Sequence, residues 1–126
     1  MRILIVEDDE ANAEAIASLL EDEGYTAVSV PDGRAALEKL RDGEATGLIL
    51  LDMSMPVMNG WRFREEQLKD AALAAVPVVV CTADGAAAEK ARAIGAAGFL
   101  RKPIDPGRLL EVVGMYCSRS RAAGTG

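Results

Sequence analysis

The sequence predicts an α/β protein whose core is a doubly wound, mostly parallel sheet of five strands. Short apolar runs alternate along the chain with segments whose apolar residues recur at helical spacing, and this alternation is typical of parallel sheets. The runs at residues 3–6 (ILIV) and 48–51 (LILL) contain no polar residue, as expected of strands buried on both faces. A length of 126 residues suits one domain with its own core.

Each predicted strand is short and is followed by a predicted helix. The strands cover residues 3–6, 25–30, 48–51, 76–81 and 98–101. The helices cover residues 12–23, 33–43, 61–72, 86–94 and 106–116. Gly24 and Gly43 end the first two helices, while Asp105 caps the last helix with Pro106 at its first position.

The predicted helices each turn an apolar side toward the sheet. The expected inward residues are Ile16, Leu19, Leu20, Ala36, Leu37, Leu40, Trp61, Phe63, Leu68, Leu109, Val112, Val113 and Tyr116. The helix at 86–94 is rich in alanine and has little bulky packing. In the helix at 61–72, Arg64 and Gln67 interrupt the apolar side, so we expect this helix to pack irregularly. Trp61 at its start is expected to be either a core residue or a half-covered one.

Two strand orders suit five such units: the flavodoxin-like order 2-1-3-4-5 and a Rossmann-like variant. The first order places strands 1 and 3 side by side at the topological switch point, where ligands bind. Both strands end in acid, with Glu7 and Asp8 after the first and Asp52 after the third. This coincidence favours the flavodoxin-like order.

Composition excludes several classes of protein. Twenty acids against 14 bases leave a net charge of -6, which argues against direct binding of nucleic acid. The first apolar run ends at Glu7 and no run reaches the roughly 20 residues of a membrane span. We therefore expect a cytoplasmic protein with no membrane partner.

The cysteine and histidine content limits which kinds of catalytic or metal site the chain can form. The two cysteines, Cys81 and Cys117, are expected to be buried free thiols, because no secretory signal is seen. The chain contains no histidine. This excludes histidine-based triads, histidine metal sites and a phosphohistidine on this chain.

Asp52 follows four aliphatic residues, at the position where a strand opens to solvent. Three carboxylates gathered at one sheet edge repel one another, by about 4 kcal/mol for a pair ~4 Å apart at an effective dielectric near 20. Glu7, Asp8 and Asp52 therefore indicate a bound cation, and oxygen ligands suit Mg²⁺. Thr82 ends the fourth strand and Lys102 follows the fifth. Carboxylates, Mg²⁺, a hydroxyl and an ammonium together form a site for a transferring phosphoryl group.

Four motifs on these strand ends resemble the receiver domain of two-component response regulators, over residues 2 to about 118. They are ILIVEDD at 3–9, LDMSMPVMNG at 51–60, VCTA at 80–83 and FLRKP at 99–103. Each motif alone is only moderately specific. Their order, separation and placement on strand ends make the resemblance highly specific.

The resemblance implies a role for particular residues. Asp52 would accept a phosphoryl group from a partner's phosphohistidine, and Thr82 and Lys102 would hold the phosphoryl oxygens. Mg²⁺ would be bound by Glu7, Asp8, Asp52 and the backbone carbonyl of Ser54. In similar proteins the bond between Lys102 and Pro103 is cis, and an aromatic residue, here Phe99, turns inward when Thr82 moves toward the phosphate. Ser54 and Asp84 occupy positions that tune phosphoryl lifetime in the family.

The resemblance also implies the partners and the domain limits. A sensor histidine kinase or a histidine phosphotransfer protein would supply the phosphoryl group. A downstream protein target would read the face formed by the helix at 86–94, the strand at 98–101 and the last helix. The receiver would cover residues 1–118, followed by a polar tail or linker at 119–126, with no room for an output domain. Such a protein is not an enzyme beyond its own phosphorylation and dephosphorylation.

Three alternatives remain open. A phosphohydrolase with an aspartyl nucleophile typically has a second acid two residues later, where this chain has Ser54. A flavodoxin-like cofactor binder needs a phosphate-cradling loop after the first strand, where EDDE at 7–10 would repel a phosphate. A receiver could also work as a constitutive adaptor without phosphorylation, and acid-labile phosphate on Asp52 would distinguish it.

Overall fold

The protein, seen in a computed structural model, contains one five-stranded parallel sheet with the strand order β2-β1-β3-β4-β5. The structure describes residues 1–53, 58–83 and 85–117. The strands are β1 (Arg2–Val6), β2 (Thr26–Val30), β3 (Thr46–Asp52), β4 (Val78–Thr82) and β5 (Gly98–Arg101). Every pair of neighbouring strands is parallel. The flavodoxin-like order predicted from the strand ends is confirmed.

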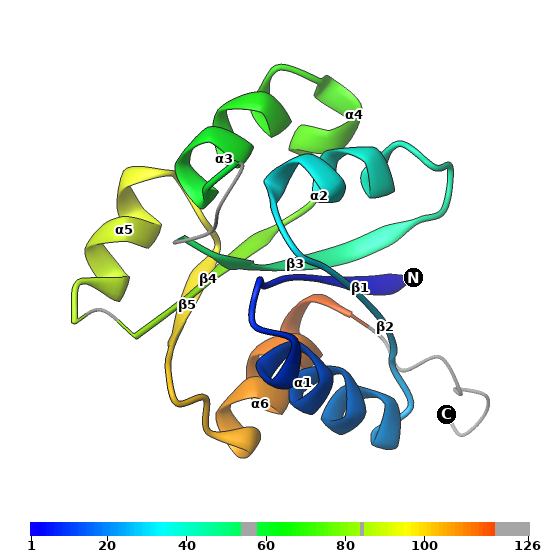
Figure 1. Ribbon diagram of the computed structural model, residues 1–126, viewed down its shortest axis with the longest axis vertical. Helices are drawn as coiled ribbons and strands as arrows, with labels where there is room; N and C mark the ends of the chain where they lie inside the picture. Colours follow the sequence, from blue (N-terminus) through cyan, green and yellow to red (C-terminus); the bar gives the residue numbers. More distant parts are fainter. Residues whose placement is uncertain (54–57, 84, 118–126) are drawn as a thin grey trace.

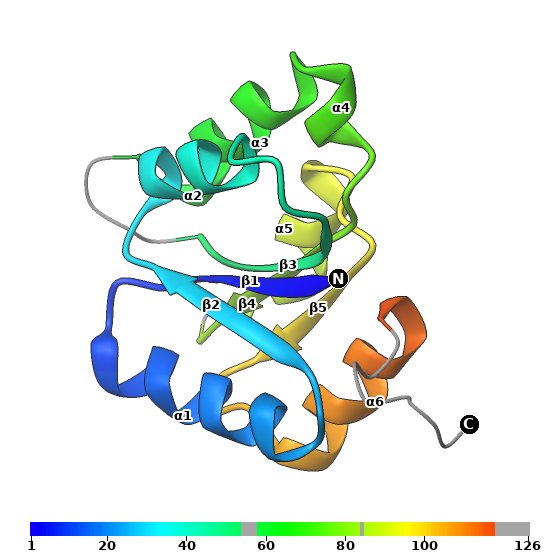
Figure 2. The same ribbon diagram turned by 90° about the vertical axis from the view of Figure 1, so that its right-hand side faces the viewer.

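Helices cover both faces of the sheet (Figures 1 and 2). They are α1 (Glu10–Asp22), α2 (Gly33–Leu40), α3 (Gly60–Leu68), α4 (Ala71–Ala74), α5 (Ala87–Ala93) and α6 (Pro106–Tyr116). α1 and α6 lie on one side, whereas α2, α3, α4 and α5 lie on the other. None of the helices in the described part of the chain is both long and apolar enough to cross a membrane.

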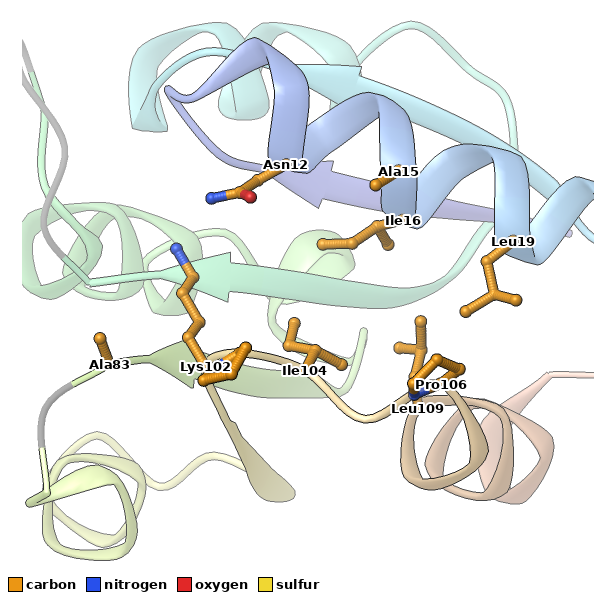
Figure 3. Close-up of a pocket in the computed structure, with 10 residues that line it drawn as sticks. Asn12, Ala15, Ile16, Leu19, Ala83, Lys102, Ile104, Pro106 and Leu109 are labelled. Atoms are coloured by element: carbon orange, nitrogen blue, oxygen red, sulfur yellow. The ribbon is translucent and has the colours of Figure 1, made fainter.

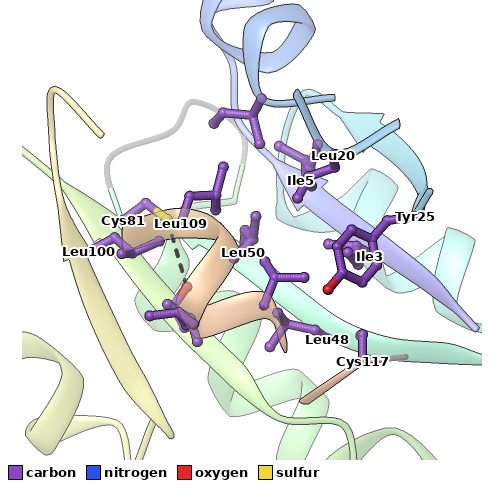
Figure 4. Close-up of a cluster of buried hydrophobic side chains, with 14 of the residues drawn as sticks. Ile3, Ile5, Leu20, Tyr25, Leu48, Leu50, Cys81, Leu100, Leu109 and Cys117 are labelled. Carbon is purple, nitrogen blue, oxygen red and sulfur yellow. Dashed lines mark hydrogen bonds between the residues drawn. The ribbon is translucent and has the colours of Figure 1, made fainter. Parts of the chain in front are cut away.

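Two apolar clusters follow from this layering, because side chains alternate between the two faces of a strand. One joins α1 and α6 to Ile5, Leu50 and Val79 on the sheet (Figure 4). The other joins α2 and α3 to Leu4 and Ile49 on the opposite face. Both free cysteines are buried, as predicted. β1, β3 and β4 therefore have apolar side chains on both faces.

Most helices begin at an aspartate or asparagine whose side chain accepts a backbone N–H of the first turn. Such a cap satisfies a donor that the helix itself cannot. The capping residues are Asp9, Asp32, Asn59, Asp70 and Asp105. The cap at Asp9 starts α1 two residues earlier than the periodicity of its apolar residues predicts. The predicted cap at Asp105 is confirmed.

The single helix predicted at 61–72 is wrong: the chain forms α3 and the separate short helix α4. Gln67, interpreted as an interruption of the apolar side, is fully buried. Its amide donates to the carbonyls of Leu73 and Val76 at 2.9 and 3.1 Å. The buried amide thereby satisfies carbonyls in the bend between α3 and β4.

Leu68 does not face inward as predicted, and of the two alternatives for Trp61 the half-covered one holds. Trp61 and Leu68 are 42% and 52% exposed, whereas Phe63 is buried. α3 turns Phe63 and Gln67 toward the sheet, so the polar residue occupies a place that periodicity assigns to an apolar one.

Arg2, the first residue of β1, is a second buried polar residue, and it lies at the edge of the sheet where the strands begin. Arg2 donates to Thr46, to the carbonyl of Lys39 and twice to the Asp42 carboxylate. These bonds lower the pKa of Asp42 to about 2. The Arg2 guanidinium thereby joins the start of β1 to the chain between α2 and β3.

Candidate functional site

The three predicted carboxylates meet at the carboxyl edge of the sheet. Val6 and Leu51 are register partners in β1 and β3, so the next residues, Glu7 and Asp52, lie level with each other. One carboxylate oxygen from each of Glu7, Asp8 and Asp52 lies within 4.8 Å of the other two. Glu7 and Asp52 are buried, whereas Asp8 is exposed. The cluster thus consists of two buried acids and a third acid that is exposed to solvent.

Lys102 reaches the same cluster from the end of β5. Its Nζ lies 2.6 Å from Glu7 Oε1 and 3.6 Å from Asp52 Oδ2. Its backbone N–H donates to the Thr82 carbonyl at 3.0 Å, and the bond to Pro103 is cis, as predicted. The ammonium therefore bridges the two buried acids.

The charges of the site influence one another. Burial, together with the nearby Asp52 charge, raises the pKa of Glu7 against the lowering effect of the Lys102 hydrogen bond. Burial lowers the pKa of Lys102, but the hydrogen bond to Glu7 and the charges of Asp52 and Glu7 more than offset this, so its pKa is raised above the ordinary value for lysine. The lysine therefore stays charged and offsets part of the repulsion among the acids.

Thr82 and Phe99 lie on the two strands that follow β3 in the sheet, Thr82 on β4 and Phe99 on β5. Thr82 is the last residue of β4 and is buried, whereas Phe99 in β5 is partly buried. Phe99 is the register partner of Val80. Since Thr82 follows Val80 by two residues, Thr82 and Phe99 start from the same face of the sheet.

The two other residues given a role from the resemblance, Ser54 and Asp84, lie outside the described residues. The chain leaves the site toward α3 through Met53, whose carbonyl accepts the Gly60 N–H at 3.3 Å. A Cβ at Gly60 would lie 2.8 Å from Met53 Cα. Only glycine allows α3 to begin so close to the backbone that follows Asp52.

The chain that folds into this charged site matches a known protein family. The family model of the response regulator receiver domain matches residues 3–114. The chain belongs to this family. The match includes every residue predicted for the site.

Relatives of this receiver domain come from several organisms. Protein PilH of Pseudomonas aeruginosa is 30% identical over 114 residues, which are 89% of this chain and 93% of PilH. The ycf29 protein of Pyropia yezoensis is 31% identical, but the match spans 94% of this chain and only 54% of that protein. Among solved structures, the chemotaxis response regulator CheY4 of Vibrio cholerae has a TM-score of 0.82 and 28% identity, covering 90% of this chain and 96% of that one.

The receiver domain also has a groove that the sequence analysis missed (Figure 3). Its volume is about 660 Å³, and it runs between α1 and the segment that joins β5 to α6. Asn12 and Lys102 lie at one end, with Leu19 and Pro106 at the other. Helical periodicity predicts Leu19 as an inward residue, but only the tertiary structure shows that it lines an open groove leading to the site.

Proposed function

We propose that this protein is the phosphoacceptor of a two-component phosphorelay and that Asp52 takes the phosphoryl group. The donor is a phosphohistidine on a sensor histidine kinase or a histidine phosphotransfer protein. The observation that carries the proposal is the meeting of Glu7, Asp8, Asp52 and Lys102 within one edge of a receiver fold. We propose residues 1–118 as the extent of the receiver.

The proposed step is an in-line phosphoryl transfer. An oxygen of the Asp52 carboxylate forms a bond to phosphorus while the phosphorus–nitrogen bond of the donor breaks, and the imidazole leaves with the bonding electrons. In this proposal the Lys102 ammonium and the Thr82 hydroxyl hold oxygens of the transferring group. The chain promotes only its own phosphorylation and dephosphorylation in this proposal.

The donor set of the site fits Mg²⁺. Glu7, Asp8 and Asp52 supply oxygen atoms, the ligands that Mg²⁺ prefers, and the exposed Asp8 leaves room for water. When bound, Mg²⁺ would neutralise charge on the phosphoryl oxygens. The proposed fourth protein ligand, the carbonyl of Ser54, lies outside the described residues.

Mg²⁺ is expected to stabilise the protein against unfolding, because a cation that binds only the folded state shifts the equilibrium by mass action. At a hundredfold excess of Mg²⁺ over its dissociation constant, the gain is about 2.7 kcal/mol. Thermal melts of wild type with and without Mg²⁺ measure it. Asp8→Asn removes one ligand at the exposed side and should reduce the gain. Equal melting temperatures of wild type with and without Mg²⁺ would show that these acids do not bind the ion.

We propose that Thr82 and Phe99 pass the signal to a downstream protein. A phosphoryl group on Asp52 would draw the Thr82 hydroxyl toward it, and the partly buried Phe99 ring can move into the space that Thr82 leaves. This couples the site to the face formed by α5, β5 and α6, which we propose as the surface that the target reads. The side chains of Thr82 and Phe99 lie on the same face of the sheet, which supports this coupling.

Thr82→Ala is expected to be phosphorylated at Asp52 more slowly than wild type, and once phosphorylated to lack the response of Phe99. Aromatic NMR signals measure this well, since the chain has only two phenylalanines and the other, Phe63, is fully buried under α3. In phosphorylated wild type the Phe99 signals should shift while those of Phe63 stay. If the Phe99 shift persists in Thr82→Ala, the signal takes another route.

The groove beside Lys102 is the proposed docking place for the phosphodonor protein. Its lining is mostly apolar, and its end at Lys102 leads to Asp52. The segment 7–23, which includes α1, has eight acids and no lysine or arginine. The fitting donor surface is therefore a helix with an apolar stripe flanked by basic residues.

Ala15→Arg is expected to slow phosphotransfer from an autophosphorylated sensor kinase by about tenfold or more. Ala15 is exposed and lines the groove, so arginine there blocks the groove and repels a basic partner without disturbing the core. Ser18→Arg, at an exposed α1 position outside the groove lining, is the matched control. Both variants should accept phosphate from acetyl phosphate as wild type does. Equal transfer rates from the kinase to both variants would place docking elsewhere.

A further inference from the structure

Arg64 joins α3 to the carboxyl end of α5. Its Nε donates to the carbonyl of Ile94 at 2.8 Å, and one terminal nitrogen donates to the carbonyl of Gly95 at 3.0 Å. Ile94 is the C-cap residue of α5. The last carbonyls of a helix have no partner within it, and the helix dipole makes this end negative. The guanidinium therefore satisfies both the hydrogen-bonding and the charge requirement of this end.

The arginine is itself held in place. Its other terminal nitrogen donates to Gln67 Oε1 at 2.8 Å, and the fully buried Gln67 amide donates to Leu73 and Val76. These bonds connect α3, α4 and the chain entering β4 into one frame. The carboxyl end of α5 is attached to this frame through Arg64.

The rest of α5 is packed against the sheet only by small side chains. Its buried residues are Ala87 and Ala91, so the apolar contact of this helix is shallow. Its N-cap residue, Ala86, has a methyl side chain, which offers no acceptor for a capping hydrogen bond. A Cβ on Gly85, just before the helix, would meet no atom within 4 Å. There is thus open space around Gly85, just before the amino end of α5, and the attachment through Arg64 lies at the opposite end.

We infer that Arg64 is the positioning residue that fixes the carboxyl end of α5, so that phosphorylation of Asp52 moves chiefly the amino end of this helix. The inference rests on the proposed phosphorylation of Asp52. α5 follows directly on the loop after Thr82, so a displacement of that loop reaches the helix at its amino end first. Arg64 does not belong to the phosphorylation site. It would nevertheless determine which part of the α5 surface changes on phosphorylation and can be recognised by a target protein.

Amide hydrogen exchange of the full chain tests the inference. The Lys90 amide donates to the Ala86 carbonyl in the first turn of α5. In wild type, phosphorylation with acetyl phosphate and Mg²⁺ should change the exchange rate of this amide. The exchange rates of the Ile94 and Ala96 amides should stay within about twofold of their values without phosphate. In Arg64→Met the amides of Ile94 and Ala96 should exchange about tenfold faster or more even without phosphate, and phosphorylation should then affect both ends. Arg62→Met is the control, because Arg62 is exposed and its guanidinium pairs with Glu66 on its own helix.

The outcomes separate the anchor from the phosphorylation. If the exchange rates of Ile94 and Ala96 in unphosphorylated Arg64→Met stay within about twofold of wild type, Arg64 does not fix the carboxyl end of α5. Equal changes in exchange rate at both ends of α5 in phosphorylated wild type would also overturn the inference. A protein that takes no phosphate from acetyl phosphate would overturn the proposed function, while the unphosphorylated comparison still decides the anchor. If Arg64→Met does not fold, Arg64→Lys replaces it, because lysine keeps the charge but cannot bond both carbonyls and Gln67 in the same way.

Discussion

Incubation with Mg²⁺ and acetyl phosphate is expected to add one phosphoryl group to the wild-type protein and none to Asp52→Asn. The side-chain amide of this variant has nearly the shape of the carboxylate but is not a nucleophile for phosphorus, so the loss should be complete. Intact-protein mass spectrometry measures the added phosphate. Chelation of Mg²⁺ should also prevent labelling, because the transferring oxygens then lack a cation beside Lys102.

The chemistry of the label provides the control for this experiment. An acyl phosphate on Asp52 is cleaved by hydroxylamine, whereas a phosphate ester on serine or threonine is not. Asp42→Asn, at the opposite end of the sheet beside Arg2, is a matched substitution that should leave labelling unchanged. Hydroxylamine-resistant label, or label that persists in Asp52→Asn, would contradict the assignment.

Lys102→Met is expected to destabilise the metal-free protein by about 2 kcal/mol, because it leaves the buried acids Glu7 and Asp52 without their ammonium partner. Removing one member of a fully buried pair costs about 3–5 kcal/mol, and the side chain of Lys102 is 19% exposed, so a smaller loss is expected. In the double variant Glu7→Gln with Lys102→Met, most of this loss should disappear. Chemical denaturation of the four proteins of this cycle measures the coupling.

Acid should rescue the lysine variant, as follows from the direction of the Glu7 shift. The pKa of Glu7 is already raised in the folded protein, so the folded state takes up a proton at a higher pH than the unfolded state does. Stability therefore increases as the pH falls through the folded pKa toward 4.5, and more so when Lys102 is absent. Lys69→Met is the control, because Lys69 is 70% exposed and pairs with Glu66 at the surface, where a pair contributes less than about 1 kcal/mol. A loss in Lys102→Met no larger than this control would contradict the proposed balance of charges.

The strand pattern and the strand ends could be predicted from the sequence because they depend on local chemistry. Apolar runs such as 48–51 are expected to be buried, and an aspartate directly after such a run is expected at its open end. Once β1 and β3 were expected to be neighbours, Glu7 and Asp52 had to converge. The structure agrees, with Asp52 as the last residue of β3.

The division of the segment 61–72 could not be predicted in this way. Periodicity counts Gln67 as a solvent-facing residue, since an isolated amide costs free energy when buried. The amide is buried because the carbonyls of Leu73 and Val76 lie within its reach, and these carbonyls are exposed to it only by the bend between α3 and β4. Trp61 and Leu68 are exposed because α3 buries the side that has Phe63 and Gln67.

The sequence alone predicts the fold class and favours the strand order that the structure has, and it predicts the acids, hydroxyl and lysine at the strand ends, because each depends on a residue type at the end of a recognisable strand. Only the tertiary structure decided the contacts between segments distant in sequence. The ion pair of Glu7 with Lys102, the groove beside α1 and the Arg64 bonds to the end of α5 are of this kind. They depend on distances between side chains and carbonyls of different elements, and neither periodicity nor spacing along the chain contains those distances.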